Sequence, residues 1–526
     1  MNEMTSTMPG IPQWLLAVSA AAILLLSFVL FEWLQRRQTV ADPGGERYLR
    51  LNLLKFSPLK SMLKWRPFQF FMRLPFVLLF LFIIWAGLYG SQFPGGNIAT
   101  LVTWTIWWGG IIFVVIFLGK FWCYFCPWLA IAEWVQRLTF WKRKKPALNL
   151  QRKWPKALRN IYIAAGFFVL LTWLDLGFGI TMKPRETAYF ALFMLLITVL
   201  PALIFEKGSF CRYACLVGRI SGLYSLFAST ELRSSDKGVC RACRTHDCYA
   251  GNEFGYPCPT SLDLAVTHLN TYCVLCTECV KTCPYDNVAV NIRPFAADLR
   301  KTMHQRTDEA YLALIMLALA SFHGLSMTPV WTRATAWAQE WTNFSKLAVF
   351  SVGMGGIIIL LIAIYALFCW LIRLSAGTQA SQTPGKGDSE TLEITYKRLF
   401  VNFAYSLLPI ALFYHLAHNA AHLFTEGQKI VAVASDPLGR GWDLMGTADL
   451  HLAPILTMPQ IWYAQVTLII IGHVYGVYIS HGIAYHTFPD SRQAFRSLIP
   501  SLILMIAYSC FSLWLISLPM EMRTAM

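Results

Sequence analysis

Long apolar runs alternate with short polar segments along most of this chain. Several runs exceed the roughly 18 to 20 residues that a helix needs to cross the hydrocarbon core of a bilayer. We therefore predict a mainly α, polytopic membrane helix bundle with about ten spans. They lie near residues 12-33, 74-92, 98-119, 160-180, 188-205, 309-329, 347-371, 399-424, 461-485 and 498-519.

The spacing of these spans divides the chain into five sections. Residues 1-230 form an N-terminal membrane domain, and residues 231-300 form a small polar insert with an expected α+β fold. Residues 301-373 form a two-span hairpin. Residues 374-397 are rich in Gly, Ser, Thr and Gln, which is typical of a flexible linker. Residues 398-526 form a C-terminal membrane domain of three spans.

The distribution of positive charge indicates how the chain is oriented in a membrane. The net charge of +16 would suggest a nucleic-acid partner in a soluble protein. Here nine Lys and Arg residues lie in 33-73 and ten in 120-159, whereas the turn at 93-97 has none. By the positive-inside rule the basic loops face the cytoplasm. We therefore predict a multi-pass protein of the bacterial inner membrane, in contact with lipid and without a nucleic-acid partner, whose insert is cytoplasmic.

Eight cysteines of the polar insert follow the spacing of a bacterial ferredoxin. They read Cys240-x2-Cys243-x4-Cys248-x9-Cys258-Pro259 and Cys273-x2-Cys276-x2-Cys279-x3-Cys283-Pro284. In this pattern the fourth cysteine of each run binds the other cluster. One predicted 4Fe-4S cluster thus takes Cys240, Cys243, Cys248 and Cys283, and the other takes Cys258, Cys273, Cys276 and Cys279. A zinc ribbon or a disulfide scaffold is the alternative, but proline after both fourth cysteines favours a ferredoxin.

Two further cysteine pairs lie at the cytoplasmic ends of the third and fifth predicted spans. They are Cys123 with Cys126, and Cys211 with Cys215, and an amphipathic stretch follows each pair, at 128-138 and 216-227. Because the two hairpins match, the pairs are expected to converge on one site. Such a site could bind a third metal centre, hold Cu(I), or cycle between dithiol and disulfide. The alternative is that these cysteines are small apolar residues at helix ends.

Cysteine pairs at helix ends, followed by a ferredoxin segment, resemble the membrane-bound polyferredoxin family. This family includes the respiratory proteins NapH, NosR and CcoG, and the resemblance covers about residues 70-295. Membrane pairs in the family usually read C-x3-C-P. This chain has Cys123-x2-Cys126-Pro127 and Cys211-x3-Cys215 followed by Leu216. The resemblance implies 4Fe-4S clusters and a role in electron transport linked to a respiratory chain.

A histidine stripe marks the eighth predicted span. His415, His418 and His422 are spaced i, i+3 and i+7, which places them within roughly a 60° arc of a helix. His473 lies in the ninth span and His323 in the sixth. Ionisable groups inside a membrane are costly and are therefore functional candidates. The stripe could bind a b-type haem, with His415 and His473 as the best axial pair, bind another metal, receive protons from a quinol, or simply hold helices together.

The sequence thus predicts an integral membrane iron-sulfur protein that passes electrons between cytoplasmic 4Fe-4S clusters and membrane or periplasmic redox partners. Quinone, haem-linked or other redox proteins are the expected partners, and the direction of electron flow stays open. The alternative is a copper-reducing or metal-handling assembly factor for a respiratory oxidase or reductase. The chain has no phosphate-binding glycine loop, Rossmann fingerprint or hydrolytic triad, which argues against nucleotide chemistry.

Overall fold

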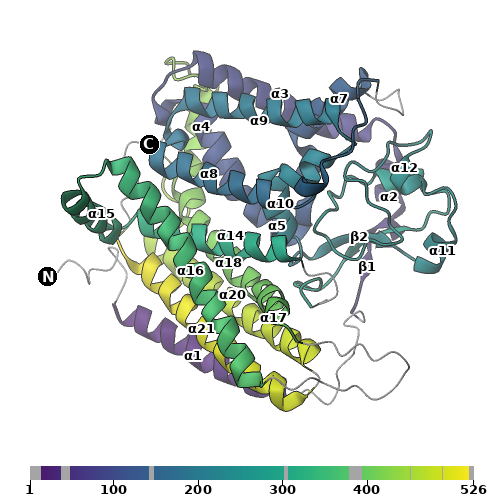
Figure 1. Ribbon diagram of the computed structural model, residues 1–526. Coiled ribbons are helices and arrows are strands. Elements are labelled where there is room, and N and C mark those ends of the chain that lie inside the picture. The colour runs from purple at the N-terminus through teal and green to yellow at the C-terminus, as the bar shows by residue number, and fades with distance from the viewer. Residues whose placement is uncertain are drawn as a thin grey trace.

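Helices dominate the computed structural model, which describes residues 13–36, 48–140, 147–300, 306–377, 394–450, 452–488 and 490–519 (Figure 1). Within these residues, nine helical stretches are long and apolar enough to cross a membrane, and the fourth predicted span is the shorter helix α8 (Tyr162–Phe178). The predicted polytopic bundle is therefore confirmed. Seven of the nine long stretches consist mainly of a single helix: α1 (Gln13–Arg36), α3 (Phe68–Tyr89), α9 (Pro184–Ile204), α14 (Thr307–Ser326), α16 (Lys346–Ala376), α20 (Met458–Thr487) and α21 (Ser491–Ser517). The main elements of the other two are consecutive helices: α4 (Ile98–Thr100), η4 (Leu101–Gly109) and α5 (Gly110–Leu118) in one, and α17 (Tyr396–Ala404), η9 (Tyr405–Leu407) and α18 (Leu408–Thr425) in the other.

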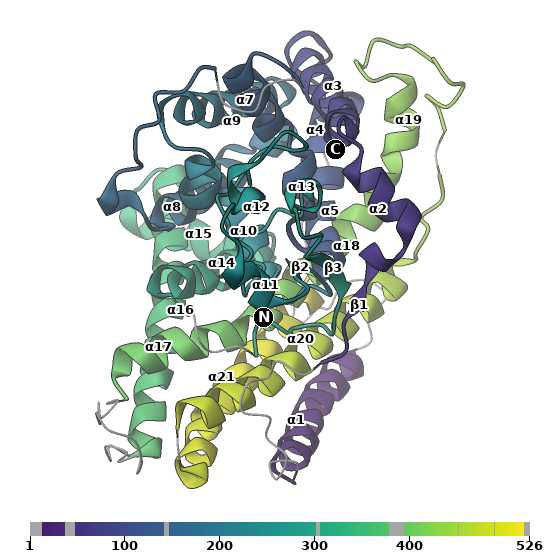
Figure 2. The same cartoon turned by 90° about the vertical axis from the view of Figure 1, so that its right-hand side faces the viewer.

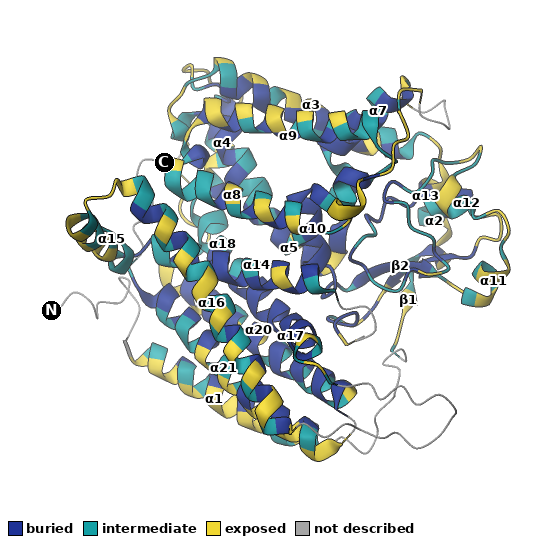
Figure 3. Cartoon of the chain, in the orientation of Figure 1, coloured by how far each residue is buried: buried dark blue, intermediate teal, exposed yellow. Residues whose placement is uncertain are grey.

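Helix α18 lies at the centre of the bundle. In the continuous stretch of α17, η9 and α18, 94% of the most apolar segment is buried, whereas in α16 only 11% is buried, so α16 presents an outer face. Figure 3 shows this contrast between the exposed helices α1 and α16 and the buried interior. Helices α18 and α20 pack closely because Gly472 has no side chain. A Cβ added at Gly472 would lie only 2.6 Å from the Cβ of Phe413. Most of the predicted linker, residues 374-397, lies outside the described residues.

The polar insert lies at one end of the bundle, on the right in Figure 1. Strands β2 (Thr230–Ser234) and β3 (Val288–Ile292) pair antiparallel, with Leu232 opposite Val290. A third strand, β1 (Leu51–Asn52), pairs with the other edge of β3, although it belongs to the predicted section 1-230. The helices of the insert are α11 (Lys237–Ala242), α12 (Asp247–Ala250) and α13 (Glu278–Thr282), and α2 (Ser57–Lys64) packs beside α13.

A buried ion network fixes this small sheet. Arg293 bonds to Asp298 at 2.6 Å and to Glu231 at 3.1 Å, Arg233 bonds to Asp298 at 3.2 Å, and Arg50 bonds to Glu231 at 2.9 Å. Burial alone would raise the pKa of Glu231, but the Arg233 and Arg293 guanidiniums hold that pKa below its usual value. The network thus ties β1, β2 and the chain after β3 into one unit.

The opposite end of the bundle, here called the far end, is closed by loops. Ser91 after α3 donates to the carbonyl of Leu438 at 2.7 Å, and Ile98 donates to that of Pro437 at 3.1 Å. The start of α4 and the segment after α18 therefore lie together, as α4 and α19 do in Figure 2, and Figure 1 shows α4 away from the insert. Further short helices are η3 (Pro94–Gly96), η7 (Ile180–Met182) and α15 (Pro329–Thr342), together with η10 (Gly427–Lys429) and α19 (Ile430–Ser435), which continue the stretch of α18.

Candidate functional site

One cavity of the insert is lined by four of the predicted ligands. Cys240 lies on α11, Cys243 follows it, Cys248 lies on α12, and Cys283 follows α13; all four face this cavity. Asn287 donates from its backbone to the Cys283 Sγ and from its side chain to the Cys240 Sγ, both at 3.3 Å. N–H groups directed at sulfur stabilise thiolates and tune the metal that they hold.

A second cavity lies beside the first and shares Cys248 and Leu264 with it. The backbone of Leu262 donates to the Cys258 Sγ at 3.4 Å. Burial raises the pKa of Cys276, and the neighbouring Cys258 raises it further, which indicates that these thiols are crowded together. The other four predicted ligands line this cavity: Cys258, Cys273, Cys276 and Cys279.

Four of the predicted ligands line each of these two cavities. Among the described residues, no group of three or more His, Cys, Asp or Glu side chains is arranged to hold one metal ion. In a 4Fe-4S cubane each thiolate binds a different iron, so the four sulfurs stand farther apart than the ligands of one ion. Four cysteines distributed around a cavity match that requirement.

The two membrane-edge cysteine pairs occupy equivalent positions in two similar turns. Cys123 lies on the short helix α6 (Trp122–Phe125), which follows η5 (Gly119–Phe121), and Cys126 precedes α7 (Pro127–Arg137). Cys211 lies on η8 (Phe210–Ala214), and Cys215 caps α10 (Leu216–Tyr224), where its Sγ accepts from the Gly218 backbone at 3.4 Å. The four thiols interact electrostatically with one another, so the structure brings the two pairs together.

Two buried cations lie close to these thiols, Lys120 to Cys123, Cys211 and Cys215, and Arg219 to Cys215. Lys120 and Arg219 are each only 1% exposed, and both donate to the carbonyl of Thr271, at 3.3 and 3.4 Å. The Nε and Nη1 atoms of Arg219 find no hydrogen-bond partner among the described residues. An unpartnered buried cation is costly unless an anion faces it. The surroundings therefore fit an anionic group held by the four thiols.

An apolar contact joins the second cavity of the insert to the membrane-edge thiols. Tyr124, Val274 and Cys276 form one buried cluster, and Cys123 packs against it. Arg73 holds this region by donating to the Tyr124 carbonyl at 2.7 Å. The cysteines of the insert and of the membrane edge are therefore separated only by packed side chains.

The predicted haem pair makes different contacts on its two helices. The His415 Nδ1 hydrogen-bonds to the hydroxyl of Tyr224. In contrast, His473 bonds to Ser27 at 2.6 Å through Nε2 and to Ser509 at 2.9 Å through Nδ1. Both ring nitrogens of His473 are thus already used in contacts between α1, α20 and α21. Haem and copper binding stay predictions, without support from this geometry.

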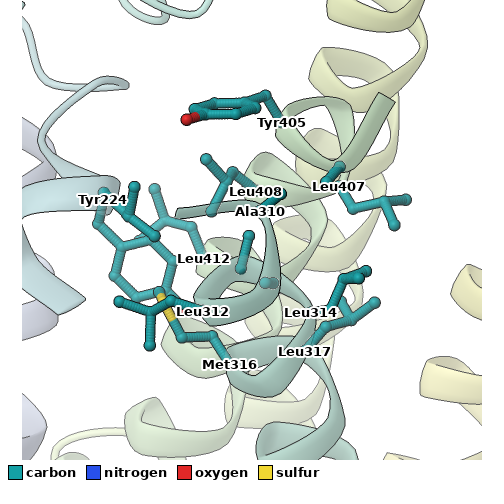
Figure 4. Packing of buried hydrophobic residues seen from close by; sticks show 14 of the residues in the cluster. Tyr224, Ala310, Leu312, Leu314, Met316, Leu317, Tyr405, Leu407, Leu408 and Leu412 are labelled. Atoms are coloured by element: carbon teal, nitrogen blue, oxygen red, sulfur yellow. The ribbon is translucent and has the colours of Figure 1, made fainter. Parts of the chain in front are cut away.

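The rest of the histidine stripe faces a cavity inside the bundle. His418 is buried and its ring centroid lies 4.6 Å from that of His323 and 5.1 Å from that of His422. The cavity has a volume of about 70 Å³, and Tyr224, His323, His415 and His418 line it together with apolar side chains. Figure 4 shows Tyr224 beside side chains of α14 and α18. Sequence analysis did not single out Tyr224, because its partner His415 lies 191 residues away.

Comparison with known proteins bears on the membrane-edge pairs. A family model described as a 4Fe-4S binding domain matches residues 100–146 and 187–233. The first stretch contains Cys123 and Cys126, the second contains Cys211 and Cys215, and both lie before Cys240. No curated protein and no solved structure matches the chain. The chain therefore carries two repeats of a 4Fe-4S binding domain, and each matched stretch contains one of the membrane-edge cysteine pairs.

Proposed function

We propose that this chain is a membrane electron carrier with three 4Fe-4S clusters. Two clusters are held by the cysteines that line the two cavities of the insert. The third is held jointly by Cys123, Cys126, Cys211 and Cys215. Iron-sulfur clusters supply one-electron chemistry at these positions, and the protein tunes them through charge and hydrogen bonds to sulfur.

The charge of its surroundings supports the third cluster. Four thiolates around a 4Fe-4S core carry net negative charge, which Lys120 and Arg219 would compensate. A pair of neutral dithiols or a disulfide would supply no counter-charge to Lys120, whereas Arg219 also interacts with the buried carboxylate of Glu309. The repeated 4Fe-4S binding domain over the same two loops favours the same assignment.

The observation that carries the proposal is the continuous series of sites from the insert into the membrane. The two insert cavities share Cys248, the second touches the membrane-edge thiols through Tyr124 and Val274, and the Cys123 Sγ lies 3.9 Å from the Ser221 Oγ. Ser221 in turn lines the cavity that contains the histidines. This order suits electron transfer between the insert and a redox partner inside the membrane.

A quinone is the membrane partner that we propose for this cavity. Its walls combine aromatic and aliphatic side chains with a few polar groups, which is typical of sites for small apolar ligands. Quinones exchange electrons together with protons, and imidazole and phenol groups can exchange those protons. The loop charges further favour the bacterial inner membrane, with the insert in the cytoplasm.

Iron and sulfide counts test the proposal directly. Anaerobically purified protein should contain about twelve irons and twelve acid-labile sulfides, because three cubanes hold four irons each. A count near eight would remove the membrane-edge cluster and leave those of the insert. Stoichiometric copper that is lost on Cys123→Ser and Cys211→Ser would instead support an assembly factor.

Matched cysteine variants locate each cluster. Cys126→Ser should remove about four irons and one electron paramagnetic resonance signal, and Cys276→Ser should remove a different signal. Cys510→Ser is the control, since Cys510 lies on α21 outside all three cysteine groups. Equal iron content in Cys126→Ser and Cys510→Ser would contradict the membrane-edge site.

A further inference from the structure

The histidine stripe of α18 continues from the cavity to the far end of the bundle. His415 faces Tyr224 in the cavity, His418 comes next along the helix, and His422 follows. The His422 Nδ1 bonds to the Glu426 carboxylate at 3.1 Å. The three histidines lie on one face of α18, and Glu426 directly follows the helix. The four ionisable residues thus form one row at spacings of three or four, where such neighbours meet.

His418 is the unusual member of this row. It is buried inside the bundle, yet neither of its ring nitrogens has a hydrogen-bond partner among the described residues. Its ring instead lies between those of His323 and His422. A buried polar group without a partner is costly and is retained where it has a task. An imidazole between two other imidazoles can accept a proton from one and pass it to the other.

The two ends of the row lie in different environments. The inner end opens into the cavity, which Asp175 also lines, beside the Ser221 contact to Cys123. At the outer end, the side chains of His422 and Glu426 are 22% and 15% exposed. Residues shortly after Glu426 pack against the start of α4 at the far end. The row therefore joins the cavity to the membrane side opposite the insert.

We propose that His415, His418 and His422 conduct protons between this cavity and the far end of the bundle. The inference rests on the proposed function of the cavity as a quinone site. Oxidation of a quinol there breaks two O–H bonds and yields a quinone. The two electrons pass singly to oxidised 4Fe-4S clusters on the insert side, and the two protons pass through the histidines to Glu426. Electrons and protons thus leave on opposite sides of the membrane.

Sealed proteoliposomes test where the protons appear. Protease cleavage of the insert reports the orientation, and pH-sensitive dyes report each compartment. A soluble benzoquinol or naphthoquinol serves as donor, and ferricyanide, which does not cross the membrane, accepts electrons on the insert side. The protons of the quinol should appear in the far-end compartment. Their appearance on the insert side would overturn the inference while leaving the proposed electron transfer intact.

Variants of the row provide the second arm. His418→Leu should slow both quinol oxidation and proton appearance at least tenfold, with iron content and cluster spectra unchanged. Glu426→Gln should slow proton appearance less, because Glu426 is partly hydrated. His481→Leu is the control, since His481 is a half-buried histidine of α20 that does not line the cavity. Unchanged rates in His418→Leu would refute the relay.

Photolabelling with an azidoquinone separates this inference from the proposal beneath it, because labelling needs no turnover. Label is expected in the cavity walls, on peptides that contain Tyr224 or His418. Label in the neighbouring apolar cavity beside Phe76 and Trp122 would place the quinone away from the row and overturn the relay. Absence of any label or quinol oxidation, with all clusters present, would remove the quinone as partner and the relay with it.

Discussion

Gly208 lies where the turn before η8 meets the insert, and replacing it with Ala should damage the cluster at Cys258. The residue has φ +75°, and an added Cβ would overlap the carbonyl oxygen of Pro259 and lie 3.2 Å from the Thr260 Cα. The obstacle is backbone, so a side chain cannot rotate out of the way. The loop that carries Cys258 has to move instead.

The expected cost has two parts. A left-handed conformation costs a non-glycine residue about 1 to 2 kcal/mol, and forced overpacking costs about 1 to 3 kcal/mol. Together Gly208→Ala should lose about 2 to 5 kcal/mol of local stability. Even the lower value raises the population of locally open protein roughly 30-fold, since about 1.4 kcal/mol is a factor of ten.

The rate of iron release to a ferrous chelator measures that opening, and two glycines of the same protein serve as controls. Gly179→Ala has φ +63° but no atom within 4 Å of the added Cβ, so it carries the conformational cost alone, away from the insert. Gly166→Ala lies within α8 in open space and should be neutral or slightly stabilising. If Gly208→Ala released iron no faster than Gly179→Ala, the close approach of the turn to the Cys258 loop would be refuted.

Four other substitutions test other parts of the structure. Glu231→Gln should cost the insert about 3 to 5 kcal/mol, because Arg293 loses one of its two buried carboxylate partners. An unchanged temperature of cluster loss would contradict this. The pKa of Glu231 is lowered in the folded protein. Its contribution to the stability of the insert should therefore be complete above the pKa of a Glu in the unfolded chain and should be lost as the pH falls through the lower pKa of the folded state, which acid titration of the wild type measures. Arg219→Met should lower the reduction potential of the membrane-edge cluster by removing positive charge, and a potentiometric titration giving a higher value would contradict the charge argument. Labelling of Gly95→Cys only from the periplasm and of Ala250→Cys only from the cytoplasm is expected, and the reverse pattern would overturn the orientation.

Local properties of the sequence were sufficient to predict the bundle. Whether a run of residues crosses a membrane depends on its own length and apolarity, so the predicted spans agree with the helices of the structure to within a few residues at most ends. Ligand spacing within a loop is local too, because two-residue gaps decide which cysteines one loop can present. The eight cysteines of the insert could therefore be assigned to two groups, and in the structure each group lines one cavity, with Cys248 lining both.

Contacts between distant elements needed the tertiary structure. The sequence suggested that the two membrane-edge pairs match, but only packing places Lys120 beside Cys123, Cys211 and Cys215, and Arg219 beside Cys215. In the same way, strand β1 joins the sheet of the insert although Leu51 precedes Thr230 of β2 by about 180 residues. Both residues pair with Ile292 of β3. Hydropathy carries no information about which helix faces meet, because every face of a membrane helix is apolar.

The histidines show the same limit most clearly. Their spacing on α18 follows from the helical period, so the sequence determined that His415, His418 and His422 share one stripe. Which neighbour each ring meets depends on how α18 is rotated against α10, α14 and α20. That rotation gives His415 a tyrosine and His418 two histidines, whereas His473 bonds to serines of α1 and α21. The sequence alone thus determined the row of imidazoles, and only the packed bundle decided that it leads from a cavity beside the cysteines to the far end.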